Sequence, residues 1–326
     1  MVVWRFLLAI GLPMLAQSWV PVESGTTANL RGVSVSGNAV WVSGEKGTVL
    51  RRGVVGGAWL SVSPKGVADL DFRNIEATAE GTAYVMSSGQ GPQSRIYKTT
   101  DGGASWMLLA TNLEPKGFWD CMGFWDATHG IIIGDPVDGR FTIMTTSDGA
   151  TWQKVKGPSA NKEEGAFAAS GSCVFTRGTR EAWFGTGGVG GARVFHSEDG
   201  GQTWSVAKTP MRHDSTSAGI FSLAFEDALH GIAVGGDYMK ADESVGNVAI
   251  TEDGGHTWFA PNGMPPRGYR SAISGGIATG PSGIDQSKDR GRSWTKVVDQ
   301  GCNAVHDGWA VGSNGRILML RADILL

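Results

Sequence analysis

Short apolar runs recur along the chain and are separated by Gly-rich or polar turns. The first group has three such runs, at residues 30–35, 39–44 and 47–51, and closes at Trp59. Later groups follow the same order, with second runs at residues 82–86, 129–135, 181–185 and 230–237. Short runs of β-branched and aromatic residues between glycines predict strands. No stretch has the length or spacing of a long helix.

A polar phrase, Ser/Thr-x-Asp-x-Gly-x-Ser/Thr-Trp, precedes the last predicted strand of most groups. Full copies occupy residues 99–106, 197–204, 251–258 and 287–294, a shorter copy occupies 146–152, and a faded one ends at Trp59. This phrase is the Asp-box, in which the carboxylate accepts hydrogen bonds from a hairpin turn and the Trp is buried between sheets. We assign its residues structural rather than catalytic roles, because a single active site does not need five identical copies. They are Asp101, Asp148, Asp199, Asp253, Asp289, Trp106, Trp152, Trp204, Trp258 and Trp294.

The spacing of these tryptophans fits one four-stranded blade of a β-propeller per repeat. Successive intervals from Trp59 to Trp294 are 47, 46, 52, 54 and 36 residues. After Trp294 the chain has three more runs, at residues 303–305, 308–312 and 315–320, and no fourth. Residues 19–22 can supply the missing strand, with Trp19 in the place of a box Trp. We therefore predict an all-β fold, a seven-bladed β-propeller with four-stranded antiparallel blades, closed by the N-terminal strand and forming one domain over residues 19–326.

Residues 1–18 have the features of a secretory signal peptide. Arg5 is their only charge, residues 6–16 are apolar, and Ala16-Gln17-Ser18 places small residues at a cleavage site before Trp19. The apolar run is too short to cross a bilayer. We expect an exported chain, periplasmic or extracellular, that is monomeric and does not itself span a membrane.

Composition narrows the possible functions. Without the signal peptide the chain has 27 basic and 31 acidic residues, which argues against a nucleic-acid surface. The three cysteines, Cys121, Cys173 and Cys302, lie in apolar first-strand contexts, so we expect buried small side chains, at least one of them an unpaired thiol. No metal site is expected from their spacing, and no dinucleotide, haem or iron–sulfur motif predicts a cofactor.

Three phrases carry a family resemblance. They are Asp-Ala-Thr-His-Gly-Ile-Ile-Ile-Gly-Asp at 126–135, Asp-Ala-Leu-His-Gly-Ile-Ala-Val-Gly-Gly-Asp at 227–237 and Asp-Gly-Trp-Ala-Val-Gly at 307–312. Together with the Asp-boxes they resemble the photosystem II stability/assembly factor family of seven-bladed propellers, within the sialidase-like superfamily. The resemblance implies a non-catalytic scaffold that holds a membrane-protein intermediate. His129 and His230 lie in these phrases, where we assign them structural roles.

A ligand site is expected at the mouth of the central channel, where the first strand of each blade begins. Aligning the first strands by their apolar alternation places Arg31, Arg73, Asp120, Ser170, Phe221, Arg270 and Asn303 at equivalent positions. Arginines suit a carboxylate or an acidic peptide, since each presents a planar fork of donors. Alternatively, each could pair with a neighbouring acid such as Asp71, Asp69 or Glu76. The predicted ligand-binding residues are Arg31, Arg73, Arg270, Asp120, Trp119, Tyr269 and Asp237, with a protein or peptide as partner, for example a membrane-protein complex.

The alternative function is a sialidase-like or other glycoside hydrolase, because sialidases also use three arginines on an Asp-box propeller. They further need a Tyr–Glu pair and an acidic Asp. Of the four tyrosines only Tyr238 and Tyr269 are expected near the channel, and no Arg-Ile-Pro phrase follows Arg31 or Arg270. Two carboxylates about 5 Å or 6.5–9.5 Å apart at the mouth would favour this alternative.

Overall fold

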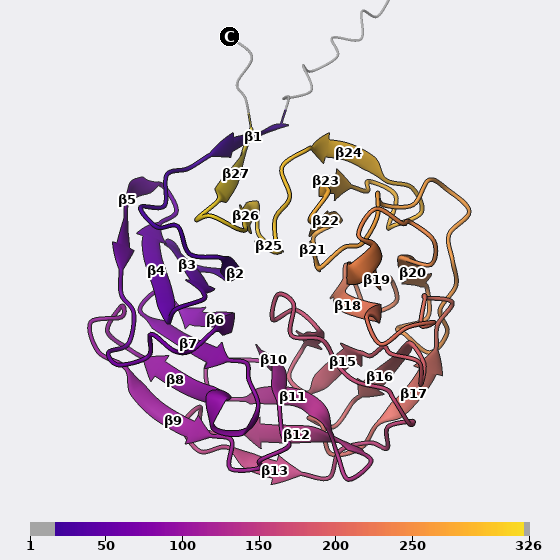
Figure 1. Cartoon of the computed structure of the whole chain (residues 1–326), viewed down its shortest axis with the longest axis horizontal. Coiled ribbons are helices and arrows are strands. Elements are labelled where there is room, and N and C mark those ends of the chain that lie inside the picture. Colours follow the sequence, from indigo (N-terminus) through magenta and orange to yellow (C-terminus); the bar gives the residue numbers. More distant parts are fainter. Residues whose placement is uncertain (1–16, 323–326) are drawn as a thin grey trace, which may run out of the picture.

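Seven antiparallel sheets radiate from a common axis in residues 17–322, the part of the chain that the structure, a computed structural model, describes (Figure 1). Six sheets have four strands and one has three. The prediction of an all-β seven-bladed propeller is confirmed. Within residues 17–322 the helical elements are two 3-10 turns, η1 (Gly91–Gln93) and η2 (Tyr238–Lys240), and no helix there has the length and apolarity to cross a membrane.

Blades one to six run outward from the axis in chain order, and blade seven takes its outermost strand from the N-terminal end of the described chain. Blades one to three comprise β2 (Leu30–Ser36), β3 (Ala39–Gly44), β4 (Thr48–Gly53) and β5 (Gly56–Ser61); β6 (Phe72–Ala79), β7 (Thr82–Ser87), β8 (Arg95–Thr99) and β9 (Met107–Thr111); and β10 (Trp119–Phe124), β11 (Gly130–Val137), β12 (Arg140–Thr146) and β13 (Gln153–Val155). Blades four to six comprise β14 (Val174–Arg177), β15 (Glu181–Gly185), β16 (Arg193–Ser197) and β17 (Ser205–Lys208); β18 (Ala218–Phe225), β19 (Gly231–Asp237) and β20 (Val248–Thr251); and β21 (Ala272–Ser274), β22 (Ile277–Gly280), β23 (Gly283–Gln286) and β24 (Thr295–Val298). Blade seven comprises β25 (Ala304–His306), β26 (Trp309–Val311), β27 (Ile317–Ala322) and β1 (Gln17–Pro21).

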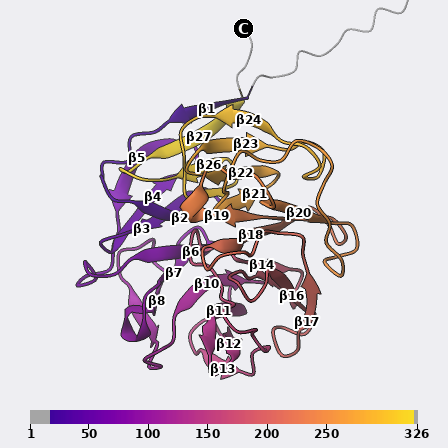
Figure 2. The same cartoon turned by 45° about the vertical axis from the view of Figure 1, so that its right-hand side comes forward.

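The N-terminal strand closes the ring as predicted. β1 pairs antiparallel with β27, with Trp19 opposite Leu320, and both views show the two strands side by side (Figures 1 and 2). Trp19 packs on the cluster shared by blades six and seven, which includes Ala272 and Ile284. The box Trp59 likewise packs on Trp309 of the preceding blade. Trp19 therefore stands where a box Trp would stand.

Three predicted element positions differ from the structure. The apolar runs that open blades four and six predict first strands beginning near Phe167 and at Tyr269, whereas these strands begin at Val174 and Ala272. Among the described residues blade five has no fourth strand, only an isolated bridge between Ile250 and Phe259. The predicted signal peptide lies outside the described residues, except for residues 17 and 18, which belong to β1.

The Asp-box turns show a repeated hydrogen-bond pattern. The Asp199 carboxylate accepts from the Thr203 amide at 2.9 Å and from the Thr203 hydroxyl at 2.6 Å. Asp101 is bonded in the same way by Ser105, and these bonds, with one from Thr99, lower the pKa of Asp101 to about 2. Such bonds to the ionised form satisfy turn amides that have no ladder partner.

Two of the three cysteines form a disulfide, which corrects our expectation that they act only as small apolar side chains. Cys121 of β10 is bonded to Cys173, which immediately precedes β14, and the two Cα atoms lie 5.8 Å apart. Cys302 is a buried free thiol, as the odd count requires, and burial raises its pKa to about 12. The disulfide joins blades three and four close to the axis.

Candidate functional site

A β-bulge recurs in the first strand of four blades. The pairing register shifts between Leu30 and Gly32, Phe72 and Asn74, Trp119 and Cys121, and Ile220 and Ser222. The residue inside each shift is Arg31, Arg73, Asp120 or Phe221. A bulge leaves one residue out of the ladder and redirects its side chain. The same local device therefore aims four different side chains toward the axis.

These side chains meet in a cavity of about 410 Å³ at the start of the first strands, here called the mouth cavity. Four aromatic rings form one of its walls. Phe167 stacks on Phe221 with ring centroids 3.9 Å apart, and Tyr269 contacts Phe221 edge-on at 4.7 Å. The ring of Tyr238 contacts those of Phe221 and Tyr269. The complete lining is Arg31, Arg73, Phe118, Asp120, Asp135, residues 166–169, Phe221, Tyr238, Tyr269, Ser271, Pro281 and Asn303.

The segment before β14, residues 165–172, crosses the centre of the ring and is here called the plug segment. In Figure 1 it reaches inward in the pink of β15. Ala168 O accepts hydrogen bonds from Arg31 Nη2 at 3.3 Å and from Arg73 Nη1 at 3.2 Å. Ser170 Oγ donates to Ser271 O of blade six at 2.8 Å. Residues 166–169 line the mouth cavity and residues 170–172 line a second axial cavity, so the plug segment separates the two.

A glycine allows the plug segment to pass close to blade two. Gly171 has φ of 74°, and a Cβ there would lie 2.5 Å from Nδ2 of Asn74 in blade two. Only glycine tolerates both the left-handed backbone and this close approach. The plug segment is therefore fitted to the inner strands on the far side of the channel.

The charges of the mouth cavity are unequally neutralised. Arg73 Nε donates to Asp71 Oδ2 at 2.7 Å, whereas Arg31 bonds only to plug carbonyls among the described residues.

Asp120 is 2% exposed and its Oδ2 has no hydrogen-bond partner among the described residues. Burial, then the nearby Asp135, raise the pKa of Asp120 well above its usual value, with Arg73 opposing. Burial also raises the pKa of Asp135, which accepts from Ala166 N at 3.1 Å. Burial therefore makes both carboxyl groups weaker acids than usual, beside the guanidinium groups of Arg31 and Arg73.

The structure separates the predicted site residues into two sets. Arg31, Arg73, Asp120 and Tyr269 line the mouth cavity. Arg270, Trp119 and Asp237 do not, and these three placements were wrong. Neighbours in an extended chain point to opposite sides, so Tyr269 and Ser271 face the cavity while Arg270 points into blade six.

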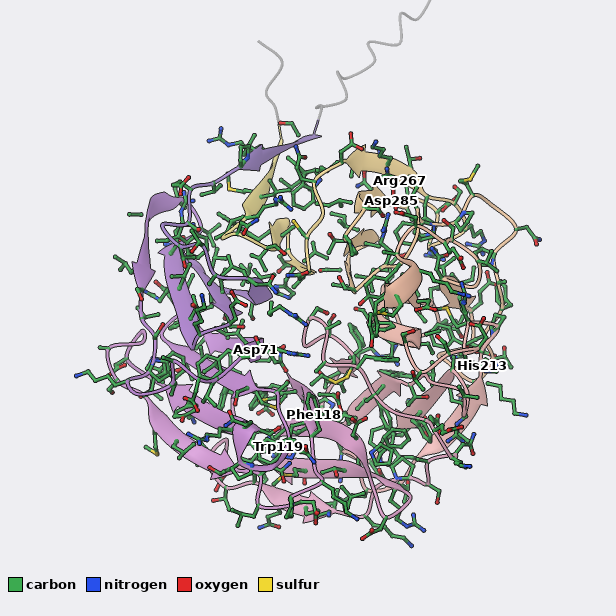
Figure 3. All side chains as sticks on the ribbon, in the orientation of Figure 1. Asp71, Phe118, Trp119, His213, Arg267 and Asp285 are labelled. Atoms are coloured by element: carbon green, nitrogen blue, oxygen red, sulfur yellow. A yellow bond between two sulfur atoms is a disulfide. The ribbon has the colours of Figure 1, made fainter. Side chains whose placement is uncertain are left out.

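Each of the three misplaced residues has a structural partner. Arg270 is fully buried and pairs with Asp285, and Figure 3 shows Asp285 beside Arg267, which binds the same carboxylate. Trp119 lies in the core between blades two and three. Asp237 accepts from Ser217 Oγ at 2.7 Å and from the Met239 amide at 3.0 Å, so it caps η2 and holds Tyr238 at the cavity.

Sequence reasoning missed part of the lining. Phe118 shares the strand face of Asp120 by simple alternation, so its place could have been predicted. Phe167 could not, because the plug segment has no strand periodicity. Tyr238 was expected near the channel, and the structure places it in the lining of the mouth cavity. His213 lies toward the rim of the molecule (Figure 3). Ser170 lines the second axial cavity instead.

A larger cavity, of about 770 Å³, lies elsewhere, between the box turns of blades three and four. Its carboxylates are occupied by their own turns: Asp148 accepts from the Thr151 amide at 2.7 Å and Asp126 from the His129 amide at 2.8 Å. His129 and His230 pair with the preceding Asp126 and Asp227. The carboxylates of this larger cavity are therefore already used to hold their own turns.

The fold and the mouth cavity define a closed seven-bladed β-propeller with a ligand-sized pocket at one end of its axis. Comparison with solved structures places it beside a structure described as "YCF48 bound to D1 peptide", with a TM-score of 0.61, 14% identity, and coverage of 96% of this chain and 100% of that one. The structure of U3-55K gives a TM-score of 0.61 at 11% identity, covering 93% of this chain and 98% of that one. The computationally designed Ika8 protein gives 0.55 at 11%, covering 94% and 100%.

These likenesses confirm that the resemblance to the assembly-factor propellers holds at the level of fold. A scan against protein-family models finds no match, and a search of curated proteins finds none either. Identities this low, shared by proteins with unrelated descriptions, establish the architecture alone.

Proposed function

We propose that this chain is a non-catalytic binding scaffold that takes a carboxylate-bearing peptide segment of a partner protein into the mouth cavity. The observation that carries the proposal is the pairing of two inward-aimed arginines, Arg31 and Arg73, with a wall of four aromatic rings. The neighbour described as bound to a D1 peptide supports a peptide as the ligand class. A subunit of a membrane-protein complex, captured during assembly, is the partner we expect.

The chemistry of the cavity suits such a segment. Arg31 Nη1 and Arg73 Nη2 have no hydrogen-bond partner among residues 17–322 and remain available as donors. A carboxylate bound by such donors gains about 1.5–3 kcal/mol per charge-assisted bond. The aromatic wall accepts an adjacent apolar side chain. Burial raises the pKa of Asp120 and of Asp135, so the cavity disfavours the ionised forms of these groups, which are the forms that would repel an anionic ligand.

We further propose that the chain acts as an exported monomer in the periplasm or outside the cell. The signal-peptide features of residues 1–18 support export. The Cys121–Cys173 disulfide adds support, because disulfides persist mainly in oxidising compartments.

Peptide binding tests the proposal directly. A set of synthetic peptides with free C-terminal carboxylates, each matched to its C-terminal amide, is titrated by fluorescence anisotropy against the wild type and the double variant Arg31→Gln/Arg73→Gln. We expect the wild type to prefer carboxylates and the double variant to bind at least tenfold more weakly. Tyr238→Ala tests the aromatic wall without removing a bond to the plug segment.

The matched control is Arg180→Gln/Arg290→Gln, which removes the same charge outside the mouth cavity. If both double variants weakened peptide binding equally, the effect would come from net charge, and the mouth cavity would not be the binding site. Thermal unfolding of each variant shows whether the fold is retained.

One observation favours a second function. Asp120 and Asp135 both line the mouth cavity with raised pKa values, and a glycoside hydrolase needs one carboxyl group with a raised pKa as its general acid. Against this, Asp120 is almost wholly buried and Asp135 holds the Ala166 amide. Turnover of sialosides or aryl glycosides between pH 4 and 8, lost in Asp120→Asn, would establish the hydrolase instead.

A further inference from the structure

A cluster of metal-binding side chains lies on blade four, away from the axis. Glu181 begins β15, His196 lies in β16, and Glu198 follows β16 in the Asp-box turn. One ligand atom from each of these residues lies within 4.8 Å of the other two. None of the three belongs to the mouth cavity.

The strand register explains why these side chains meet. Trp183 is opposite His196 in the β15–β16 ladder, and their rings stack with centroids 4.3 Å apart. Glu181 lies two residues before Trp183 and Glu198 two residues after His196, so all four occupy one face of the sheet. The stacked tryptophan fixes the plane of the imidazole at the edge of this cluster.

The imidazole has an unused coordinating atom. His196 is 6% exposed, yet its Nε2 has no hydrogen-bond partner among the described residues. Glu181 Oε1 is the nearest carboxylate atom that the structure pairs with it, at 3.9 Å. Burying a ring nitrogen without a hydrogen-bond partner costs free energy, because the nitrogen loses its hydrogen bond to water. A bound ligand would remove that cost.

The Glu181 carboxylate is already held in place for such a ligand. Arg177, directly opposite in the β14–β15 ladder, donates Nε to Glu181 Oε2 at 2.7 Å. This bond leaves Oε1 free on the His196 side and orients the carboxylate, as partners of metal ligands commonly do. With a neutral imidazole, two carboxylates and one guanidinium, the cluster has a net charge of −1 before any ion binds.

We propose that Glu181, His196 and Glu198 bind a divalent transition-metal ion, Zn²⁺ above all. Imidazole nitrogen combined with carboxylate oxygen is a donor set suited to zinc, whereas Mg²⁺ and Ca²⁺ prefer oxygen alone. Tetrahedral zinc with bonds of about 2.0–2.2 Å needs donor atoms roughly 3.5 Å apart. Glu198 is exposed on its turn and can close the remaining gap, with water in the fourth position.

Bound zinc would join the box turn of blade four to its inner strands. Glu198 would no longer move with the turn alone, because the ion would tie it to the buried His196 and to Glu181.

The untagged full chain, stripped with a chelator, tests the site by isothermal titration with Zn²⁺ and by absorption spectroscopy with Co²⁺. We expect one ion per chain and visible Co²⁺ bands of four-coordinate geometry. Glu198→Gln, an exposed change that does not threaten folding, should weaken Zn²⁺ binding by about tenfold or more. His196→Gln should abolish the Co²⁺ bands.

The matched control is Glu252→Gln, because Glu252 has the position of Glu198 in the Asp-box of blade five and pairs with Arg292 instead. It should leave Zn²⁺ affinity unchanged. Absence of Zn²⁺ uptake at micromolar concentration, or equal affinity of Glu198→Gln and Glu252→Gln, would overturn the proposal.

Discussion

The Glu76 side chain lies on β6 against the second axial cavity, partly buried and bonded by Asn74 Nδ2 at 3.3 Å. Burial raises the pKa of Glu76 to about 7, although the Asn74 bond opposes the shift. An acid whose folded-state pKa is raised stabilises the fold fully below its unfolded pKa of 4.5, and that stability is lost as pH rises through about 7.

We therefore predict that Glu76→Gln raises the melting temperature at pH 8 and changes it little at pH 5. The expected gain at pH 8 is about 1 kcal/mol, since each unit of pKa shift corresponds to about 1.4 kcal/mol and part of the shift is screened by solvent. Calorimetry across pH 5 to 8 measures it. A pH-independent effect would show that Glu76 is ionised throughout this range.

Residue-level prediction from the sequence succeeded where a side chain's direction followed from its strand and failed where two neighbours were both assigned to the channel. Arg31, Arg73 and Asp120 are aimed by bulges at equivalent positions. Arg270 was chosen beside Tyr269, and Trp119 beside Asp120, although alternation allows only one of each pair to face inward. Burial of Arg270 against Asp285 depends on contacts between strands that the sequence does not display.

At the scale of elements, the plug segment is followed directly by a disulfide. Cys173 directly follows Ser172, and Cys121 anchors it to the first strand of blade three. We predict that Cys121→Ala/Cys173→Ala lowers the free energy of unfolding by about 2–4 kcal/mol and speeds amide exchange in residues 165–172. Denaturant titration and hydrogen-exchange mass spectrometry measure the two effects.

Cys302→Ala is the control, because Cys302 is buried in blade seven's cluster and bonded to no other cysteine. It should leave exchange in the plug segment unchanged. Protection of residues 165–172 that survives loss of the disulfide would mean that the arginine and serine bonds suffice to hold it.

The regular elements were predictable because each strand is a short apolar run between turn residues. Residues 39–44 and 181–185 were predicted with the bounds that β3 and β15 have. The plug segment was not predictable, since its conformation is set by partners in blades one, two and six. The pairing of cysteines 52 residues apart likewise depends on neighbouring blades meeting in space.

At the scale of the molecule, closure of the ring removes the free edge of β27. We predict that deletion of residues 1–21, which removes β1, lowers the melting temperature and causes concentration-dependent association through the exposed strand edge. Light scattering after size exclusion measures the association.

Trp19→Ala separates packing from edge pairing, because it keeps the β1 backbone. It should cost about 2 kcal/mol of stability and leave the protein monomeric. Association of Trp19→Ala to the same extent as the deletion variant would show that lost packing, rather than an open edge, drives it.

The pairing of β1 with β27 also sets the order of events during synthesis. Trp19 pairs with Leu320, so the contact that completes the fold joins segments at opposite ends of the described chain. A strand that leaves the ribosome first must wait, unpaired, until the last strand has emerged. Contacts between such distant segments are slow to form, and waiting edges are exposed to wrong partners. Pairing of β1 with β27 is therefore expected to be a late step of folding, with a rate that depends on how quickly the two strands find each other.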